Sequence, residues 1–210
     1  YFYLAQSYRD CNEKEKAMHW YKERVKSGGW IQEIYYSLYQ IARLKEMLQY
    51  PEDEVIQSYM IAFESLPQRI EAIFGAVLFC RKVNRFNQAY ILAKYAQTIP
   101  KVYEGLFVEN WIYDFAIEDE LSVCCYHVGK LKEGKELTQK LINKVPEEHK
   151  KRFIHNLDEY NKKIKFGEIK TARAVDDNFD TKYEVVYIEL LDDKSVDGVS
   201  TPLEITPTNK

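Results

Sequence analysis

Residues 1–21 read YFYLAQSYRDCNEKEKAMHWY, in which large apolar residues surround a small one, Ala17. Ala17 follows Tyr8 by nine residues, and Tyr21 comes about one helical turn later. Where the second helix of a hairpin crosses the first, a side chain larger than a methyl group would force the two axes apart. The pattern therefore predicts two helices that cross at Ala17.

The same spacing recurs along the chain, which is typical of a helical repeat. Cys80 is followed nine residues later by Ala89, and Cys125 by Gly134. A further copy centred on Ser58 fits when an insertion of roughly seven residues is allowed. The repeats predict helices over residues 1–11 and 13–27, 32–48 and 52–65, 69–83 and 85–98, 117–129 and 131–144, and a terminal helix over 147–164.

These residues resemble the tetratricopeptide repeat, whose period is 34 residues. The interval from Leu4 to Leu38 is 34 residues. Positions of the repeat signature are occupied by Tyr1, Leu4, Ala5, Tyr8, Ala17 and Tyr21. The resemblance implies an all-α fold, a tetratricopeptide-like α/α superhelix in which helix pairs stack into a right-handed solenoid. The first helix of each pair would line a concave groove.

Longer strings resemble the helical region that follows the catalytic domain in some family 2 glycosyltransferases. Within residues 1–160 they are FYLAQSYRD (2–10), the Gly28-Gly29-Trp30 turn, YSLYQIARL (36–44) and LFVENWIYDF (106–115). Where that family often has Pro in the LFVE-W motif, this sequence has Asn110. The resemblance implies a parent polypeptide in carbohydrate biosynthesis, with this region as an accessory module.

Residues 1–165 form the predicted helical domain, and residues 166–210 form an acidic tail with five basic and ten acidic residues. The helical period ends at the start of this tail. Residues 183–191, YEVVYIELL, have the composition of a strand, but one strand is not stable alone. The tail is therefore expected to be non-helical: disordered, a strand added to the solenoid, or the start of another domain.

Composition places the chain among ordinary globular proteins, with 210 residues, 46% hydrophobic and 30% charged. A formal charge of -3 excludes the basic surface that a general nucleic-acid binder needs. The longest apolar runs, such as residues 72–80, fall short of the roughly 20 residues that span a bilayer. Four cysteines without CxxC spacing indicate a reducing, cytoplasmic setting. The start at Tyr1 is typical of a fragment.

No catalytic constellation is apparent, and no metal or cofactor is expected. A family 2 glycosyltransferase needs an α/β nucleotide-sugar domain and an acidic motif that holds a divalent metal. Residues 1–165 have no α/β pattern, and Asp192-Asp193 in the tail are interpreted as solvated charge. Cys80 and Cys125 fall on core positions, and the histidines lack the spacing of a zinc site. Whether the chain takes part in catalysis stays open.

The first helices of the repeats carry polar and aromatic residues at corresponding, groove-facing positions. Alignment on the small residues superposes Arg9 with Arg43 and Arg81, Phe2 with Tyr36 and Phe74, and Gln6 with Gln40 and Leu78. Guanidinium groups bind carboxylates or phosphates bidentately, and aromatic rings stack on peptides or sugars. These residues are therefore a candidate site for an extended anionic ligand.

A structural alternative exists for the three arginines. Four carboxylates lie near enough in sequence to pair with them between repeats: Asp10, Glu13, Glu46 and Glu71. In that case the arginines would hold the helices together and would not bind a ligand.

Residues 99–114 are too long for a repeat turn and rich in large apolar side chains, among them Phe107, Trp111 and Tyr113. A long loop of this composition folds back on its domain or serves a function. Two roles are predicted for these three residues: covering the junction of the third and fourth repeats, or docking a catalytic domain.

The sequence as a whole predicts an interaction module of a glycosyltransferase-containing protein. Its expected partner is a protein or peptide, or an N-terminal catalytic domain of the same polypeptide. One alternative is a region that grips an acceptor glycan or another anionic ligand for the enzyme. A third is a free-standing adaptor that binds a peptide.

Overall fold

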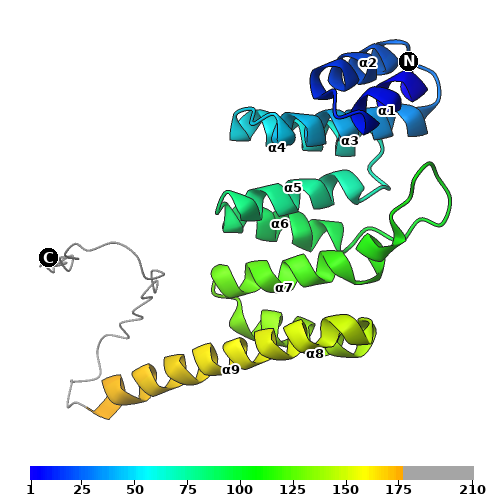
Figure 1. Ribbon diagram of the computed structural model, residues 1–210. Helices are drawn as coiled ribbons and strands as arrows, with labels where there is room; N and C mark the ends of the chain where they lie inside the picture. Colours follow the sequence, from blue (N-terminus) through cyan, green and yellow to red (C-terminus); the bar gives the residue numbers. More distant parts are fainter. Residues whose placement is uncertain (177–210) are drawn as a thin grey trace, which may run out of the picture.

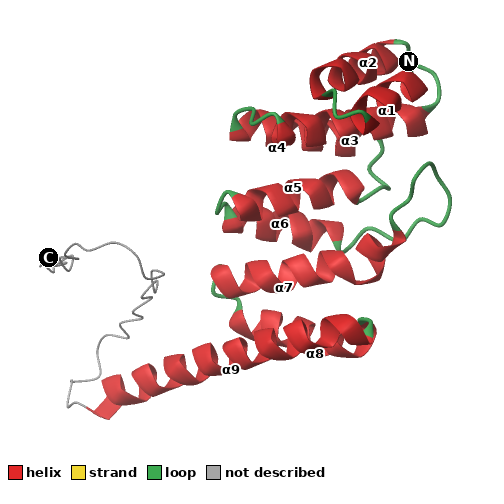
Figure 2. Cartoon of the chain, viewed as in Figure 1, coloured by secondary structure: helices red, strands yellow, loops and turns green. Residues whose placement is uncertain are grey.

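The computed structural model describes residues 1–176, with side chains as far as residue 167, and this part of the chain is all-helical (Figures 1 and 2). The helices are α1 (Phe2–Asp10), α2 (Lys14–Lys26), α3 (Ile31–Met47), α4 (Glu52–Ser65), α5 (Glu71–Lys82), α6 (Phe86–Ala96), the π-helical η1 (Ile112–Ala116), α7 (Ile117–His127), α8 (Leu131–Lys144) and α9 (Glu147–Asp176). Each α-helix packs on the next one along the chain. The result is a row of helix pairs, α1–α2, α3–α4, α5–α6 and α7–α8, with α9 packed on α8 at the end (Figure 1).

The all-α prediction is confirmed for the described residues, and most helix ends fall within a few residues of those predicted. The predicted end of the last helix at residue 164 is wrong, because α9 continues to Asp176. The sequence there, KFGEIKTARAVD, is rich in residues with high helix propensity, which explains the extension. Residues 166–176 of the predicted non-helical tail are therefore helical, and the predicted strand over 183–191 lies outside the described residues.

The hairpin turns repeat the same geometry. After α1, α3, α5 and α7, the chain turns through one residue of positive φ: Asn12 (61°), Gln49 (57°), Asn84 (61°) and Gly129 (76°). In each turn the next N–H donates to the carbonyl five residues back, as Glu13 does to Tyr8. This bond satisfies a carbonyl that the helix end leaves free. The four hairpins are thus built alike.

Small residues lie at the helix crossings, as the spacing predicts. Ala17 and Ala89 are fully buried. A Cβ atom at Gly134 would lie 2.8 Å from the Cβ of Cys125 and would collide with the hydroxyl of Tyr160. Cys125 lies on α7 and Tyr160 on α9, so the missing side chain at Gly134 lets α8 approach both of its neighbours.

The loop that joins α6 to η1, residues 97–111, departs from this regular pattern and is called the connecting loop. It extends away from the stack before the chain enters η1 (Figures 1 and 2). Its last part returns to α3 and the start of α5, where Phe107 contacts Tyr36 at 4.8 Å between ring centroids. No helix in the described part of the chain is long and apolar enough to cross a membrane.

Gly134→Ala is expected to destabilise the chain by about 1–3 kcal/mol, because the added methyl group overpacks the contact with Cys125 and Tyr160. Thermal and urea unfolding followed by circular dichroism measure the change. Gly167→Ala in α9 is the control, since nothing lies within 4 Å of its added Cβ atom. Equal loss of stability in both variants would contradict the crossing assigned to Gly134.

Candidate binding pocket

A cavity of about 590 Å³ lies between α3 and α5, next to the end of the connecting loop, and is called the α3–α5 pocket. Its walls include Tyr39, Arg43, Phe74, Arg81, Glu109 and Trp111. Apolar surface with a few placed polar groups, in a cavity of this size, is typical of a ligand site. The pocket is therefore the candidate functional site.

The predicted register of three arginines holds for two of them. Counted from the positive-φ residue of the hairpin turn, Arg9 and Arg81 occupy one position, and Glu46 occupies it in α3. Arg43 lies three residues earlier, at the position that Gln6 holds in α1. The alignment on small residues placed all of the inserted residues of this hairpin in its turn. In the structure the helices of the hairpin are themselves longer, so Arg43 does not fall at the position of Arg9.

Arg9 and Arg81 are both engaged by carboxylates. Arg9 donates to Asp10 at 2.8 Å and to the hydroxyl of Tyr36 at 2.9 Å. Arg81 donates to both carboxylate oxygens of Glu120, at 2.6 and 3.3 Å. Asp10 was among the predicted partners, whereas Glu120 was not. Burial raises the pKa of Glu120, although Arg81 opposes that shift.

The other carboxylates predicted to pair with the arginines have different partners. Glu13 pairs with Lys16, at 3.2 Å. Glu46 accepts from Lys82 at 3.1 Å and from the hydroxyl of Tyr59 at 2.9 Å. Glu71, described below, pairs with an arginine outside the predicted set.

Arg43 has no carboxylate partner among residues 1–167, whose side chains the structure describes. Among the side chains described, none forms a hydrogen bond or ion pair with it, and its guanidinium lies 5.7 Å from the ring centroid of Tyr39. Arg43 is half-buried and lines the pocket. Its donors are therefore available to a ligand in the pocket.

The predicted aromatic row is largely covered. Phe2 and Phe74 are buried, and Phe2 contacts Tyr36 at 5.8 Å between centroids. The connecting loop places Phe107 against Tyr36 and Trp111 against Phe74, with the second pair 5.6 Å apart and nearly perpendicular. The row therefore packs between helices and loop, and only Phe74 among its three members lines the pocket.

Gln6 and Gln40, also predicted for the groove, do not line the α3–α5 pocket. Gln40 is 2% exposed. The Nε2 atoms of both residues are buried without a partner among the described side chains. Leu78, which the sequence alignment superposed on them, does line the pocket.

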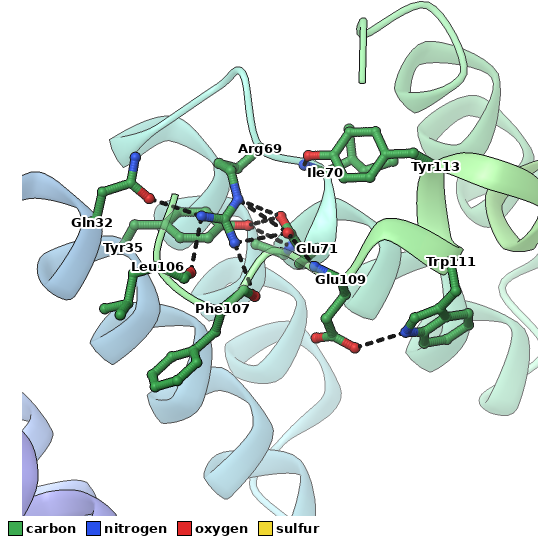
Figure 3. A network of polar contacts seen from close by, with 11 residues as sticks. Gln32, Tyr35, Arg69, Ile70, Glu71, Leu106, Phe107, Glu109, Trp111 and Tyr113 are labelled. Atoms are coloured by element: carbon green, nitrogen blue, oxygen red, sulfur yellow. Dashed lines mark hydrogen bonds and ion pairs between the residues drawn. The ribbon is translucent and has the colours of Figure 1, made fainter. Parts of the chain in front are cut away.

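A buried ion pair between Arg69 and Glu71 fixes the connecting loop (Figure 3). The two side chains are 2% and 1% exposed, and their closest oxygen and nitrogen atoms are 2.7 Å apart. Arg69 also donates to Gln32 of α3 at 2.8 Å and to the backbone carbonyls of Leu106 and Phe107 at 3.1 and 3.3 Å. One guanidinium thus joins α3, the start of α5 and the loop.

Glu71 completes the network from its other side. Its carboxylate accepts from the hydroxyl of Tyr35 at 3.1 Å and from the backbone N–H of Glu109 at 3.2 Å. The hydroxyl of Tyr113 accepts from the N–H of Ile70 at 3.1 Å (Figure 3). These bonds hold residues 109 and 111 where they form a wall of the pocket.

Of the predicted docking residues, Tyr113 is turned inward to this network, while Phe107 and Trp111 are 50% and 46% exposed. The loop therefore does more than cover the junction of the third and fourth repeats, because it reaches back to α3. Arg69 was not among the residues predicted from the sequence. The available signal was an arginine two residues before a glutamate at a predicted helix start, which is too common to be specific.

The cysteines are poor candidates for nucleophiles. Burial raises the pKa of Cys80 to about 11 and those of Cys124 and Cys125 to about 12, so their thiolates are scarce at neutral pH. Cys11 is exposed. Among the described side chains, no group of three His, Cys, Asp or Glu could hold a metal ion.

Comparison with known proteins assigns no family to the chain. No protein-family model matches the sequence, and no curated protein is similar enough to be a relative. The resemblances to tetratricopeptide repeats and to glycosyltransferase accessory regions therefore depend on the motifs alone.

Arg69→Met is expected to destabilise the chain by about 3–5 kcal/mol, because it leaves the carboxylate of Glu71 buried without its counter-charge. Urea unfolding measures the loss. Arg85→Met is the control, since the ion pairs of Arg85 with Glu52 and Asp53 lie at the surface and should matter little. A loss at Arg69 no greater than at Arg85 would show that the buried pair does not anchor the loop.

A thiol reagent such as Ellman's reagent is expected to label only Cys11 in the folded chain and all four cysteines after unfolding. Burial and the scarcity of thiolate both protect the other three. Absorbance and mass spectrometry of labelled peptides identify the sites. Rapid labelling of Cys80 or Cys125 without unfolding would contradict their core positions.

Proposed function

We propose that the chain is a tetratricopeptide-like accessory module of a glycosyltransferase-containing protein, which binds a ligand in the α3–α5 pocket. The four alike hairpin turns and the small residues at the crossings support a solenoid of the tetratricopeptide kind. In that arrangement the first helices, α3 and α5 among them, would line the concave side. The motif resemblance supports the link to glycosyl transfer, and the free cysteines support a cytoplasmic location.

The observation that carries the proposal is that Arg43 lines the pocket without a carboxylate partner among the described side chains. Other arginines in the body of the fold, such as Arg69 and Arg81, are matched by carboxylates. Arg43 is half-buried and unmatched, on the wall of a cavity that aromatic side chains also line. Because none of the described side chains accepts a hydrogen bond from its guanidinium, the donors of Arg43 can bind a ligand in the cavity.

A second candidate function is docking of a catalytic domain against α1. The outer face of this helix exposes large apolar side chains: Tyr3 is 78% exposed, Leu4 40%, and Trp30, in the turn before α3, 56%. Exposed apolar side chains of this size, where they gather into a patch, are typical of protein contacts. This function would use a different face and is compatible with a ligand in the pocket.

The pocket is expected to bind small fragments when the isotope-labelled chain is screened by two-dimensional NMR against a fragment library. Signals of Arg43, Leu78 and Trp111 should change together, because these residues share the pocket wall. Leu78→Trp should abolish the changes by filling the cavity. Leu131→Trp, on α8, is the control and should retain them. Absence of binding, or changes that gather elsewhere, would contradict the pocket as the site.

A further inference from the structure

We infer that the ligand of the α3–α5 pocket is a neutral saccharide, bound through its hydroxyl groups by Arg43 and Glu109 and through an apolar ring face by Trp111. This inference rests on the proposed function of the pocket and names the class of its ligand.

The charges around the pocket disfavour a strongly charged ligand. Three cations and two anions line it, but Arg81 is paired with Glu120 and Lys82 with Glu46. Arg43 and Glu109 remain, one of each sign. An anion would meet the carboxylate of Glu109, and a cation would meet Arg43. A ligand that offers both donors and acceptors without net charge suits both groups.

Glu109 is held in place but retains free acceptor capacity. Its backbone N–H donates to Glu71 at 3.2 Å, and its Oε2 accepts from the indole N–H of Trp111 at 3.2 Å (Figure 3). Neither contact uses its Oε1 atom. A carboxylate whose orientation is already fixed costs little ordering entropy when it accepts from a ligand hydroxyl. Arg43 supplies the complementary donors, since all of its side-chain N–H groups lack partners in the described structure.

Vicinal hydroxyl groups match this pair of side chains. Each hydroxyl is at once a donor and an acceptor, so one can accept from a guanidinium while its neighbour donates to a carboxylate. The C–H face of a sugar ring is apolar and packs on aromatic rings. Trp111 offers such a surface, since this residue is 46% exposed and lines the pocket. The volume of about 590 Å³ falls within the range of small-molecule sites.

An acidic peptide fits these observations less well. The carboxylate of Glu109, which has no cation paired with it among the described side chains, stands in the wall and would repel its side chains. The described part of the chain is all-helical, so no sheet edge is available there to pair with an extended backbone. The arrangement therefore favours a compact, uncharged polyol over a peptide.

The inference is tested by NMR titration of the labelled chain with neutral oligosaccharides of glucose, mannose, galactose and N-acetylglucosamine. Oligogalacturonate and a glutamate-rich peptide represent the anionic classes. At least one neutral oligosaccharide is expected to shift the indole signal of Trp111 and the Nε–H signal of Arg43 along a saturable curve. The anionic probes are expected to leave both signals unchanged.

Variants separate the assigned contacts from general surface effects. Trp111→Ala and Arg43→Met should each weaken saccharide binding about tenfold or more, as loss of a stacked ring or of a charged hydrogen-bond donor does. Trp30→Ala should have no effect, because Trp30 lies in the turn before α3 and does not line the pocket. Should Trp111→Ala fail to fold, Glu109→Gln decides, since it keeps the shape and the backbone contact and should also weaken binding.

The outcomes distinguish the two proposals. If fragments gather in the pocket and no neutral oligosaccharide shifts these signals, the saccharide is ruled out and the pocket remains a binding site. If neither binds, both proposals fail. Binding of oligogalacturonate or of the peptide in preference to every neutral sugar would overturn the ligand class, and unchanged binding in Glu109→Gln and Arg43→Met would overturn the assigned contacts.

Discussion

The ion pair of Arg69 and Glu71 is the interaction on which the shape of the candidate site depends. Two opposite charges taken out of water stabilise a fold only when their remaining donors and acceptors are also satisfied. Here Gln32, Tyr35 and three backbone groups of the connecting loop complete the set. The hydrogen bonds that satisfy the buried pair therefore also order the connecting loop. They fix the backbone of Glu109, which forms part of the pocket wall.

The helices could be predicted from the sequence because their signals are local. Hydrophobic periodicity and the small residues at helix crossings are features of a single hairpin. The structure has helices where the periodicity predicts them, and close helix contacts at small residues such as Gly134. The network around Arg69 could not be predicted in the same way. Its partners Gln32 and Leu106 are each 37 residues distant in sequence, and nothing in either segment marks the other.

The register of the arginines could be predicted only in part, since Arg9 and Arg81 correspond in the structure and Arg43 does not. Small residues give the spacing of a hairpin but do not tell whether an insertion lengthens its helices or its turn. The turn itself carries that information, since Asn12, Asn84 and Gly129 are residues that adopt positive φ readily. In the second hairpin the same conformation falls on Gln49, a residue with no such preference. The turn between residues 48 and 52 was predicted, but its positive-φ residue was not marked by the sequence, and Arg43 was aligned about one helical turn too late.

The connecting loop also bears on cooperativity. In a simple repeat array each unit touches only its neighbours, so unfolding can begin at an end and spread unit by unit. Residues 106–109 contact α3 and the start of α5 and then lead directly into η1 and α7. They tie together units that nearest-neighbour packing alone would leave separable. The helices from α3 to α7 should consequently exchange their amide protons as one block, with fraying confined to α1 and α2 on one side and α8 and α9 on the other.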